Sequence, residues 1–146
     1  MSDQVYFEDV VEGQEIPLLE KKVNVLNLVM YHGIIWVYDR IHFDHIYATE
    51  RRGLPGVVAP GNIAVDYYGH LLNDWIGEKG ELRKISTQYR NFMVAGDTLY
   101  CGGRVINKYI KDGKGYVELE LWINNQKGAN CAPGKGVVEL PIRHTQ

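Results

Sequence analysis

The sequence lacks the features that would assign it to a membrane or nucleic-acid-binding class. No apolar run approaches the roughly 20 residues that a membrane-spanning helix needs. Lys and Arg number 16 against 18 Asp and Glu, a net charge of −2, so no basic surplus points to nucleic acid. The stretch MSDQVYFEDVVEGQEIP is acidic and polar, and we expect no signal or transit peptide. These absences predict a cytoplasmic protein with no membrane or nucleic-acid partner.

Cysteine is scarce as well, with two residues in a chain of 146. Cys101 and Cys131 lack the paired spacing of a zinc site, so we expect reduced thiols and no bound metal. Cys131 lies in a glycine-rich stretch, but no neighbour that would lower its pKa is evident, and we assign it no role. The length suits one folded unit, and we expect a single domain over residues 1–146.

Alternating apolar residues dominate the second half of the chain. Residues 81–143 predict four strands separated by the turn sequences VAGDT, KDGKG and APGKG. Within YVELELWIN, one predicted face carries only aliphatic side chains: Val117, Leu119, Leu121 and Ile123. Earlier in the chain, LLEKKVN is a candidate for a further short extended segment.

Residues 62–75 predict the most apolar helix of the chain. Only one narrow stripe is polar, consisting of Asp66, His70, Asn73 and Asp74. A helix with so much apolar surface is buried, and in a chain this short the strands must wrap around it. Helices followed by antiparallel strands indicate an α+β fold, with one long central helix on the concave face of the sheet.

The residues before this helix predict two shorter helices. Asn24 is a good N-cap, and helical spacing continues to Gly33, a plausible stop. The residues at this spacing are Leu26, Val29, Met30 and Gly33. Asp44 is a second candidate N-cap, before HIYATERR, which Gly53 closes.

The segment YDRIHFDH, residues 38–45, concentrates groups able to move protons or bind metal: Asp39, His42, Asp44 and His45. From the residues alone, His42 is either a buried, hydrogen-bonded histidine or a loop residue. Asp44 is explained as a cap, and His45 then falls in the first helical turn, facing solvent. The spacing of the two histidines is not that of a metal site. Arg40 is more typical of a solvated side chain than of a substrate clamp.

Three stretches resemble the MaoC-like hydratase and dehydratase family, which has the hotdog fold. They are MYHGIIWVYDRIHFDHIYAT, LPGVVAPGNIA and ISTQYRNFMVAGDTLYCGGRV, and together they span most of residues 25–105. The resemblance implies chemistry on an acyl thioester: water is added to a trans-2-enoyl-CoA or removed from a 3-hydroxyacyl thioester.

The resemblance also implies site residues, and here the chain departs from the family. The family motif places an Asp five residues before its catalytic His. His42 matches the His, but Val37 stands where the Asp is expected. Gly61, with Asn62 beside it, matches the helix start whose backbone N–H faces the thioester oxygen. Asp39 is the nearest substitute carboxylate, although in an extended segment it lies about 6.5–7 Å along the strand from position 37.

The resemblance further implies a homodimer or higher oligomer and no cofactor, with coenzyme A present only as part of the substrate. The sequence does not decide between coenzyme A and acyl carrier protein as the acyl carrier.

Two alternative functions remain open. Val37 favours a non-catalytic hotdog subunit that binds acyl-CoA and partners a catalytic chain. Asp66 on the central helix is the residue expected of a hotdog thioesterase, although a hydrogen-bonded polar pair of Asp66 with His70 explains it equally.

Overall fold

The structure is a computed structural model that describes residues 3–143. Five strands and two helices are joined by three short helical turns. In chain order the elements are η1 (Phe7–Asp9), β1 (Leu19–Lys22), α1 (Val25–Ile35), η2 (Arg40–His42), η3 (Tyr47–Arg51), α2 (Ile63–Ile76), β2 (Glu81–Thr87), β3 (Thr98–Lys111), β4 (Lys114–Asn125) and β5 (Gly134–Leu140).

The strands form one antiparallel sheet in the order β1-β3-β4-β5-β2. Its four long strands are those predicted for residues 81–143, and β1 is the short extended segment. The alternation expected in β4 is confirmed, because its four inward aliphatic side chains are at most 1% exposed while Trp122 and its neighbours take the other face. This alternation gives the sheet one apolar face against which a helix can pack.

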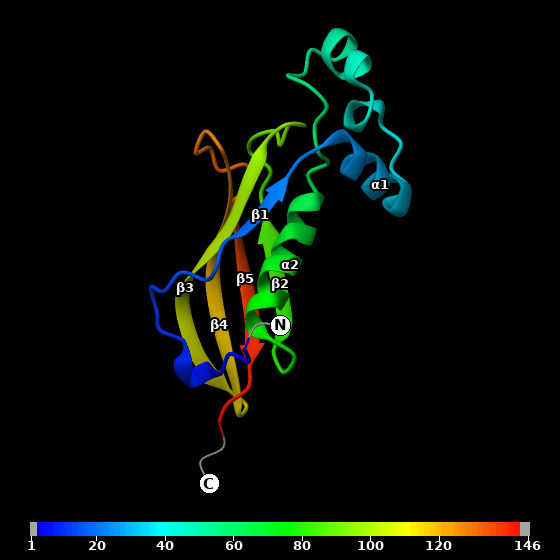
Figure 1. Cartoon of the computed structure of the whole chain (residues 1–146). Coiled ribbons are helices and arrows are strands. Elements are labelled where there is room, and N and C mark those ends of the chain that lie inside the picture. The colour runs from blue at the N-terminus through cyan, green and yellow to red at the C-terminus, as the bar shows by residue number, and fades with distance from the viewer. Residues whose placement is uncertain (1–2, 144–146) are drawn as a thin grey trace.

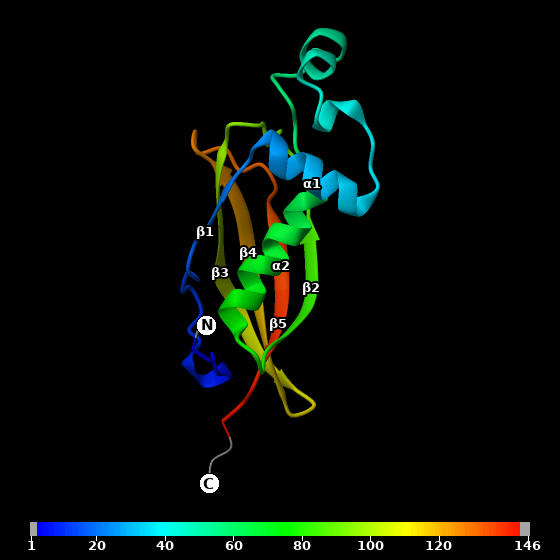
Figure 2. The same ribbon diagram turned by 45° about the vertical axis from the view of Figure 1, so that its right-hand side comes forward.

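Helix α2 lies along that apolar face, and the sheet curls around it (Figures 1 and 2). The Tyr68 hydroxyl donates a hydrogen bond to the carbonyl of Ala132, which joins the helix to the segment before β5. Gly134 leaves room for this ring, since a Cβ there would lie 3.0 Å from it. A long helix held in a curled antiparallel sheet is the hotdog fold, so the expected α+β hotdog architecture is confirmed.

The burial of α2 is less complete than the sequence predicts. Its inward side chains are buried against the sheet, but Val65 is 38% exposed and Tyr67 is half-buried. The exposed face of α2 is therefore wider than its polar stripe, and it includes apolar side chains in the single chain.

The helix and the cap predicted for α1 are present, but its end was predicted wrongly. Asn24 accepts a hydrogen bond from the N–H of Asn27, 2.8 Å away. The helix continues past Gly33 and ends at Ile35, and its C-cap is Trp36, which has a left-handed backbone with φ of 58°. The buried side chains are Leu28 and His32, whereas the residues whose spacing predicted the helix are exposed: Leu26, Val29, Met30 and Gly33. Apolar residues occur all round this helix, so their periodicity does not single out one face.

Residues 36–58 extend beyond the end of the sheet at which α2 begins, with α1 beside the first turn of α2 (Figures 1 and 2). The predicted cap of the next helical segment is confirmed, because Asp44 accepts a hydrogen bond from the N–H of Tyr47 at 3.0 Å. Within residues 3–143, no helix has the length and hydropathy needed to span a bilayer.

Candidate active site

His42 is the last residue of η2, and its ring is held at one nitrogen. Its Nδ1 lies 2.7 Å from the carbonyl oxygen of Val58. A carbonyl only accepts, so Nδ1 carries the hydrogen and donates it. In the neutral ring this leaves the lone pair on Nε2, the nitrogen available to a substrate or to water. The residue is half-buried, and the bond to Val58 fixes its ring.

Backbone hydrogen bonds fasten the His42 turn to the chain that leads into α2. The N–H of Val58 donates to Ile41 at 3.2 Å, so Val58 contacts this turn through both its N–H and its carbonyl. The N–H of Ala59 donates to Met93 at 2.7 Å, and the N–H of Ala95 donates to Val57 at 2.8 Å. The turn is thereby anchored to the sheet end of the molecule, although few of its side chains are buried.

Gly61 and Asn62 lie directly before the first residue of α2, as predicted. The first three N–H groups of α2 donate to the carbonyls of Pro60, Gly61 and Asn62, each at 3.1 Å, and the positive end of the helix dipole lies at this turn. Val58, which binds His42, is three residues from Gly61, a chain distance of at most about 11 Å. Position 61 has no space for a side chain, because a Cβ there would lie 2.7 Å from the ring of Tyr89. The Asn62 side chain makes no capping hydrogen bond and is exposed.

Asp39 is the N-cap of η2. Its Oδ1 accepts a hydrogen bond from the N–H of Ile41 at 3.2 Å, and the Arg52 guanidinium interacts electrostatically with it. The carboxylate is exposed, while Val37 is half-buried. Asp39 and His42 thus belong to one short turn, and the N–H of His42 donates to the carbonyl of Asp39 at 3.1 Å.

Asp44 and Arg40 form a structural pair next to the site. Arg40 donates to Asp44 at 2.7 Å and stacks its guanidinium over the ring of Tyr47, 4.5 Å from the centroid. The N–H of Tyr47, followed by Arg40, lowers the pKa of the Asp44 carboxyl. Arg40 is exposed, as expected, but it is paired rather than free. His45 is exposed, as its place in the first helical turn predicts.

The polar residues of α2 have separate partners. The Tyr31 hydroxyl donates to Asp66, and burial followed by this bond raises the pKa of Tyr31. His70 lies 2.8 Å from Lys21 Nζ through Nδ1 and 3.0 Å from Asp74 through Nε2. The expected hydrogen-bonded pair of Asp66 with His70 is therefore wrong, although both side chains are partnered.

His32 was not recognised as a site residue from the sequence. Its side chain is 2% exposed, and its Nδ1 lies 2.5 Å from the carbonyl of Leu28, one turn earlier in α1. Its ring stacks on that of His42, with centroids 4.6 Å apart and planes inclined by 21°. Its Nε2 is buried and has no hydrogen-bond partner among the described residues. A buried polar atom without a partner lowers the free energy of unfolding by roughly 1–3 kcal/mol. The only sign of this arrangement in the sequence is that His32 follows Leu28 by four residues, one helical turn.

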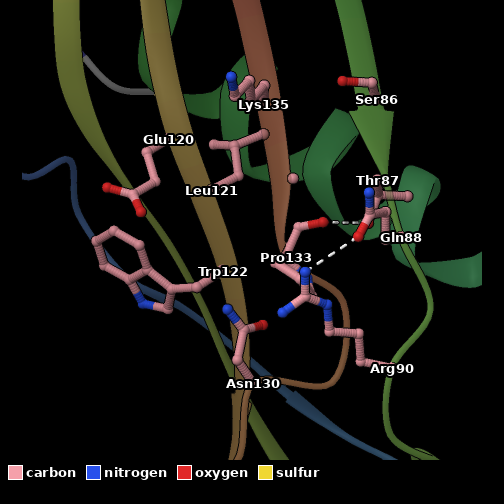
Figure 3. Close-up of a pocket in the computed structure, with 11 residues that line it drawn as sticks. Ser86, Thr87, Gln88, Arg90, Glu120, Leu121, Trp122, Asn130, Pro133 and Lys135 are labelled. Carbon is pink, nitrogen blue, oxygen red and sulfur yellow. Dashed lines mark hydrogen bonds between the residues drawn. The ribbon is translucent and has the colours of Figure 1, made fainter.

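A shallow groove lies on the opposite face of the sheet from α2 (Figure 3). Arg90 donates to Gln88 at 3.1 Å at one side of it, and Trp122 lies at the other. The groove contains none of the residues predicted for the site. Both thiols are buried, and burial raises the pKa of Cys101 to about 12, so it is unreactive at neutral pH. Within residues 3–143, no cluster of three or more His, Cys, Asp or Glu side chains is arranged to hold a metal.

Comparison with known proteins identifies solved structures that have the same fold. No family model matches the sequence, and no curated protein matches it. Solved structures match over nearly the whole chain. An (R)-hydratase from A. caviae involved in PHA biosynthesis is 19% identical, with a TM-score of 0.82 over 92% of this chain and 99% of its own. A MaoC-like dehydratase from Rhodospirillum rubrum is 16% identical, with a TM-score of 0.81 over 97% and 99%.

A third similar structure is the ChsH1-ChsH2 complex from Mycobacterium tuberculosis. Its matched chain is 16% identical, with a TM-score of 0.77 over 89% of this chain and 98% of its own. Structural similarity at these sequence identities establishes the fold. The resemblance of this chain to MaoC-like hydratases and dehydratases is therefore confirmed for the fold.

Proposed function

We propose that the protein hydrates an enoyl thioester or dehydrates a 3-hydroxyacyl thioester. The observation that carries the proposal is the state of His42. Its Nδ1 donates to the carbonyl of Val58, its Nε2 has no hydrogen-bond partner among the described residues, and Val58 lies three residues from the helix start at Gly61. An imidazole nitrogen that can exchange a proton, near the positive end of a helix dipole, is the combination that this reaction needs.

In the hydration direction, the water oxygen bonds to C3 of the substrate while one O–H bond of the water breaks. The released proton passes to Nε2 of His42. The electron pair of the C2–C3 double bond moves to C2 and onto the thioester oxygen, where the N–H groups of Gly61 and Asn62 stabilise the negative charge. His42 then returns its proton to C2, so no atom or charge is left over. Dehydration is the reverse sequence.

We assign to Asp39 the orientation of the attacking water, whose hydrogen bond its carboxylate accepts through one further water while His42 carries the proton. Asp39 is three residues from His42 in the same turn, and its carboxylate is exposed. Val37 cannot take part in proton transfer, so Asp39 is the substitute within this chain for the carboxylate that MaoC-like enzymes carry five residues before the histidine.

The proposed substrate is carried by coenzyme A or by an acyl carrier protein, and no cofactor takes part. The proposed assembly is a homodimer or a higher oligomer, with a heteromeric partner as the other possibility. Support comes from α1 and the residues after it, which expose large apolar side chains in the single chain: Leu26 (68%), Met30 (60%), Ile34 (77%) and Trp36 (77%). Leu26, Met30 and Ile34 recur every four residues and therefore lie on one side of the helix, and exposed apolar surface of this kind is typical of an interface.

The direct experiment is hydration of crotonyl-CoA by the purified chain, followed as loss of the enoyl absorbance. Longer enoyl-CoA substrates and an acyl-carrier-protein thioester follow in the same assay. A parallel measurement of released thiol tests the thioesterase alternative, in which Asp66 would act. Asp66 is already bonded to Tyr31, so we expect loss of the double bond without thiol release.

Val37 supports a second candidate function, a non-catalytic acyl-CoA-binding subunit. Val37→Asp separates the two by restoring the family spacing of Asp and His. The added carboxylate costs roughly 1–3 kcal/mol where its hydrogen bonds are incomplete. If the acyl pocket and the Gly61 site are retained, hydration rises in the variant. An inactive parent, with an equally inactive, folded variant that still binds acyl-CoA, identifies a binding subunit instead.

A further inference from the structure

His32 has a more specific relation to His42 than ordinary core packing. The two rings are nearly parallel, and each is held at Nδ1 by a backbone carbonyl: Leu28 for His32 and Val58 for His42. The two carbonyls come from different parts of the chain, namely α1 and the approach to α2. The pair is therefore a stack whose two members are anchored independently.

Anchoring of His32 makes its ring a rigid platform. Rotation about its side-chain bonds would break the bond to Leu28 and would meet a fully packed surrounding, since the side chain is 2% exposed. An imidazole anchored through Nδ1 necessarily carries a second nitrogen. The unpartnered Nε2 is thus a consequence of using an imidazole as the anchored ring.

The platform restricts how the His42 ring can turn. If the His42 ring rotated, its edge would be driven into the face of His32, and Nδ1 would leave the carbonyl of Val58. The stack therefore fixes the plane of the His42 ring, and within that plane the bond to Val58 determines that Nδ1 carries the hydrogen and Nε2 the lone pair. A flexible aliphatic side chain at position 32 would fill the same space without imposing a parallel plane.

We propose that His32 is a positioning residue for the reaction, which holds the ring plane of His42 by face-to-face stacking. The proposal rests on the proposed function in that His42 is the acid–base group. Correct placement of a reacting group within about 1 Å accounts for roughly 100-fold in rate. His32 does not touch the substrate, since it is buried beneath His42.

The test compares side chains that fill position 32 with and without a flat ring. His32→Phe keeps the ring but loses the anchor to Leu28, and we expect kcat to fall no more than about 3-fold. His32→Leu loses the ring, and we expect kcat to fall about 10–100-fold with KM changed less than about 3-fold. His32→Met replaces it if the leucine variant does not fold. Leu119→Val, a core change on β4 far along the sheet, is the matched control for loss of stability alone.

A second readout is independent of activity. In protein labelled with ¹⁵N-histidine, the nitrogen shifts of His42 report which nitrogen carries the hydrogen, with His42→Gln supplying the assignment. We expect the Nδ1–H form in the parent and in His32→Phe, and a mixture of both forms in His32→Leu.

The two readouts separate failure of this inference from failure of the proposed function. Where the parent hydrates enoyl thioesters, the proposal is overturned if His32→Leu and His32→Phe have the same kcat, or if Leu119→Val loses as much activity as His32→Leu. Where the parent hydrates none of them, the proposed function fails. The positioning of His42 is then judged by the nitrogen shifts alone, and a pure Nδ1–H form in His32→Leu overturns it.

Discussion

Residues 63–143 and residues 24–60 are held in place by different kinds of interaction. In the first region, α2 and the sheet bury a continuous set of aliphatic and aromatic side chains, many of them with no exposure at all. In the second region, the short turns expose most of their side chains, and their geometry depends on individual hydrogen bonds such as those from His42 to Val58 and from Tyr47 to Asp44. The proposed chemistry belongs to the second region.

This difference predicts how each region responds to mutation. Core packing distributes the free energy of unfolding over many contacts, so truncation of a buried side chain there lowers stability and leaves the site intact. A turn held by single hydrogen bonds has little stability to lose, but small displacements there move reacting groups. Stability and activity should therefore be damaged by different sets of residues.

The largest effect is expected from His42→Ala. If His42 is the acid–base group, kcat should fall about 10²–10⁴-fold, while the melting temperature changes little because the side chain is half-buried. Steady-state hydration of crotonyl-CoA and thermal denaturation measure the two quantities.

Leu119→Ala is the matched change in the other region. Leu119 is fully buried in β4, and its truncation should cost about 2–5 kcal/mol of unfolding free energy. The folded fraction should retain its kcat. Activity of His42→Ala within a few-fold of the parent would remove His42 from the mechanism.

How well the sequence predicts each region follows the same division. Alternation in β4 and the apolar surface of α2 predict the sheet and its helix, because many residues contribute to those patterns. The sequence did not predict which face of α1 is buried, since apolar residues surround that helix and its buried side chains are Leu28 and His32. The Asn24 and Asp44 caps were predicted, because a cap depends on neighbours in sequence. The stacking of His32 on His42 depends on tertiary contacts that no local pattern records.

The next effect in size concerns the start of α2. Gly61→Ala places a Cβ about where the ring of Tyr89 now lies, at 2.7 Å. Tyr89 is 57% exposed and must shift, together with the backbone at position 61. We expect kcat to fall roughly 10–100-fold as the N–H groups lose their alignment with the thioester oxygen.

Gly69→Ala is the control for this change, because a Cβ at position 69 of α2 meets no atom within 4 Å. It should stabilise the helix by up to about 1 kcal/mol and leave kcat unaltered. Adding Tyr89→Ala to Gly61→Ala should restore part of the lost activity by removing the clash. Full activity in Gly61→Ala alone would exclude the proposed role of this helix start.

A smaller effect is expected from Asp39→Asn. Asparagine caps a helical turn about as well as aspartate, so the bond to the N–H of Ile41 is retained and only the charge is lost. If the Asp39 carboxylate orients the attacking water, kcat should fall about 10-fold or more while acyl-CoA binding persists. Kinetics and calorimetric titration with a saturated acyl-CoA measure both. Unaltered kcat would show that Asp39 only caps the turn, and His42 would then be the one catalytic side chain in this region.

The smallest effect, Asp44→Asn, separates structural from catalytic residues within the turn region itself. The N–H of Tyr47 and the Arg40 guanidinium hold the pKa of Asp44 below its ordinary value of 3.8. A depressed folded-state pKa means that the carboxylate stabilises the fold above its unfolded pKa, and that this contribution is lost as pH falls through the lower folded value.

Since the group is at the surface, Asp44→Asn should lower the melting temperature at pH 7 by no more than about 2 °C. The difference between parent and variant should close as pH is lowered below about 4. Melting curves at pH 7, 5 and 3 measure it, and Arg40→Gln should reproduce part of the loss at pH 7. A gap of equal size at pH 3 and pH 7 would show that geometry, rather than the charge of Asp44, stabilises this turn.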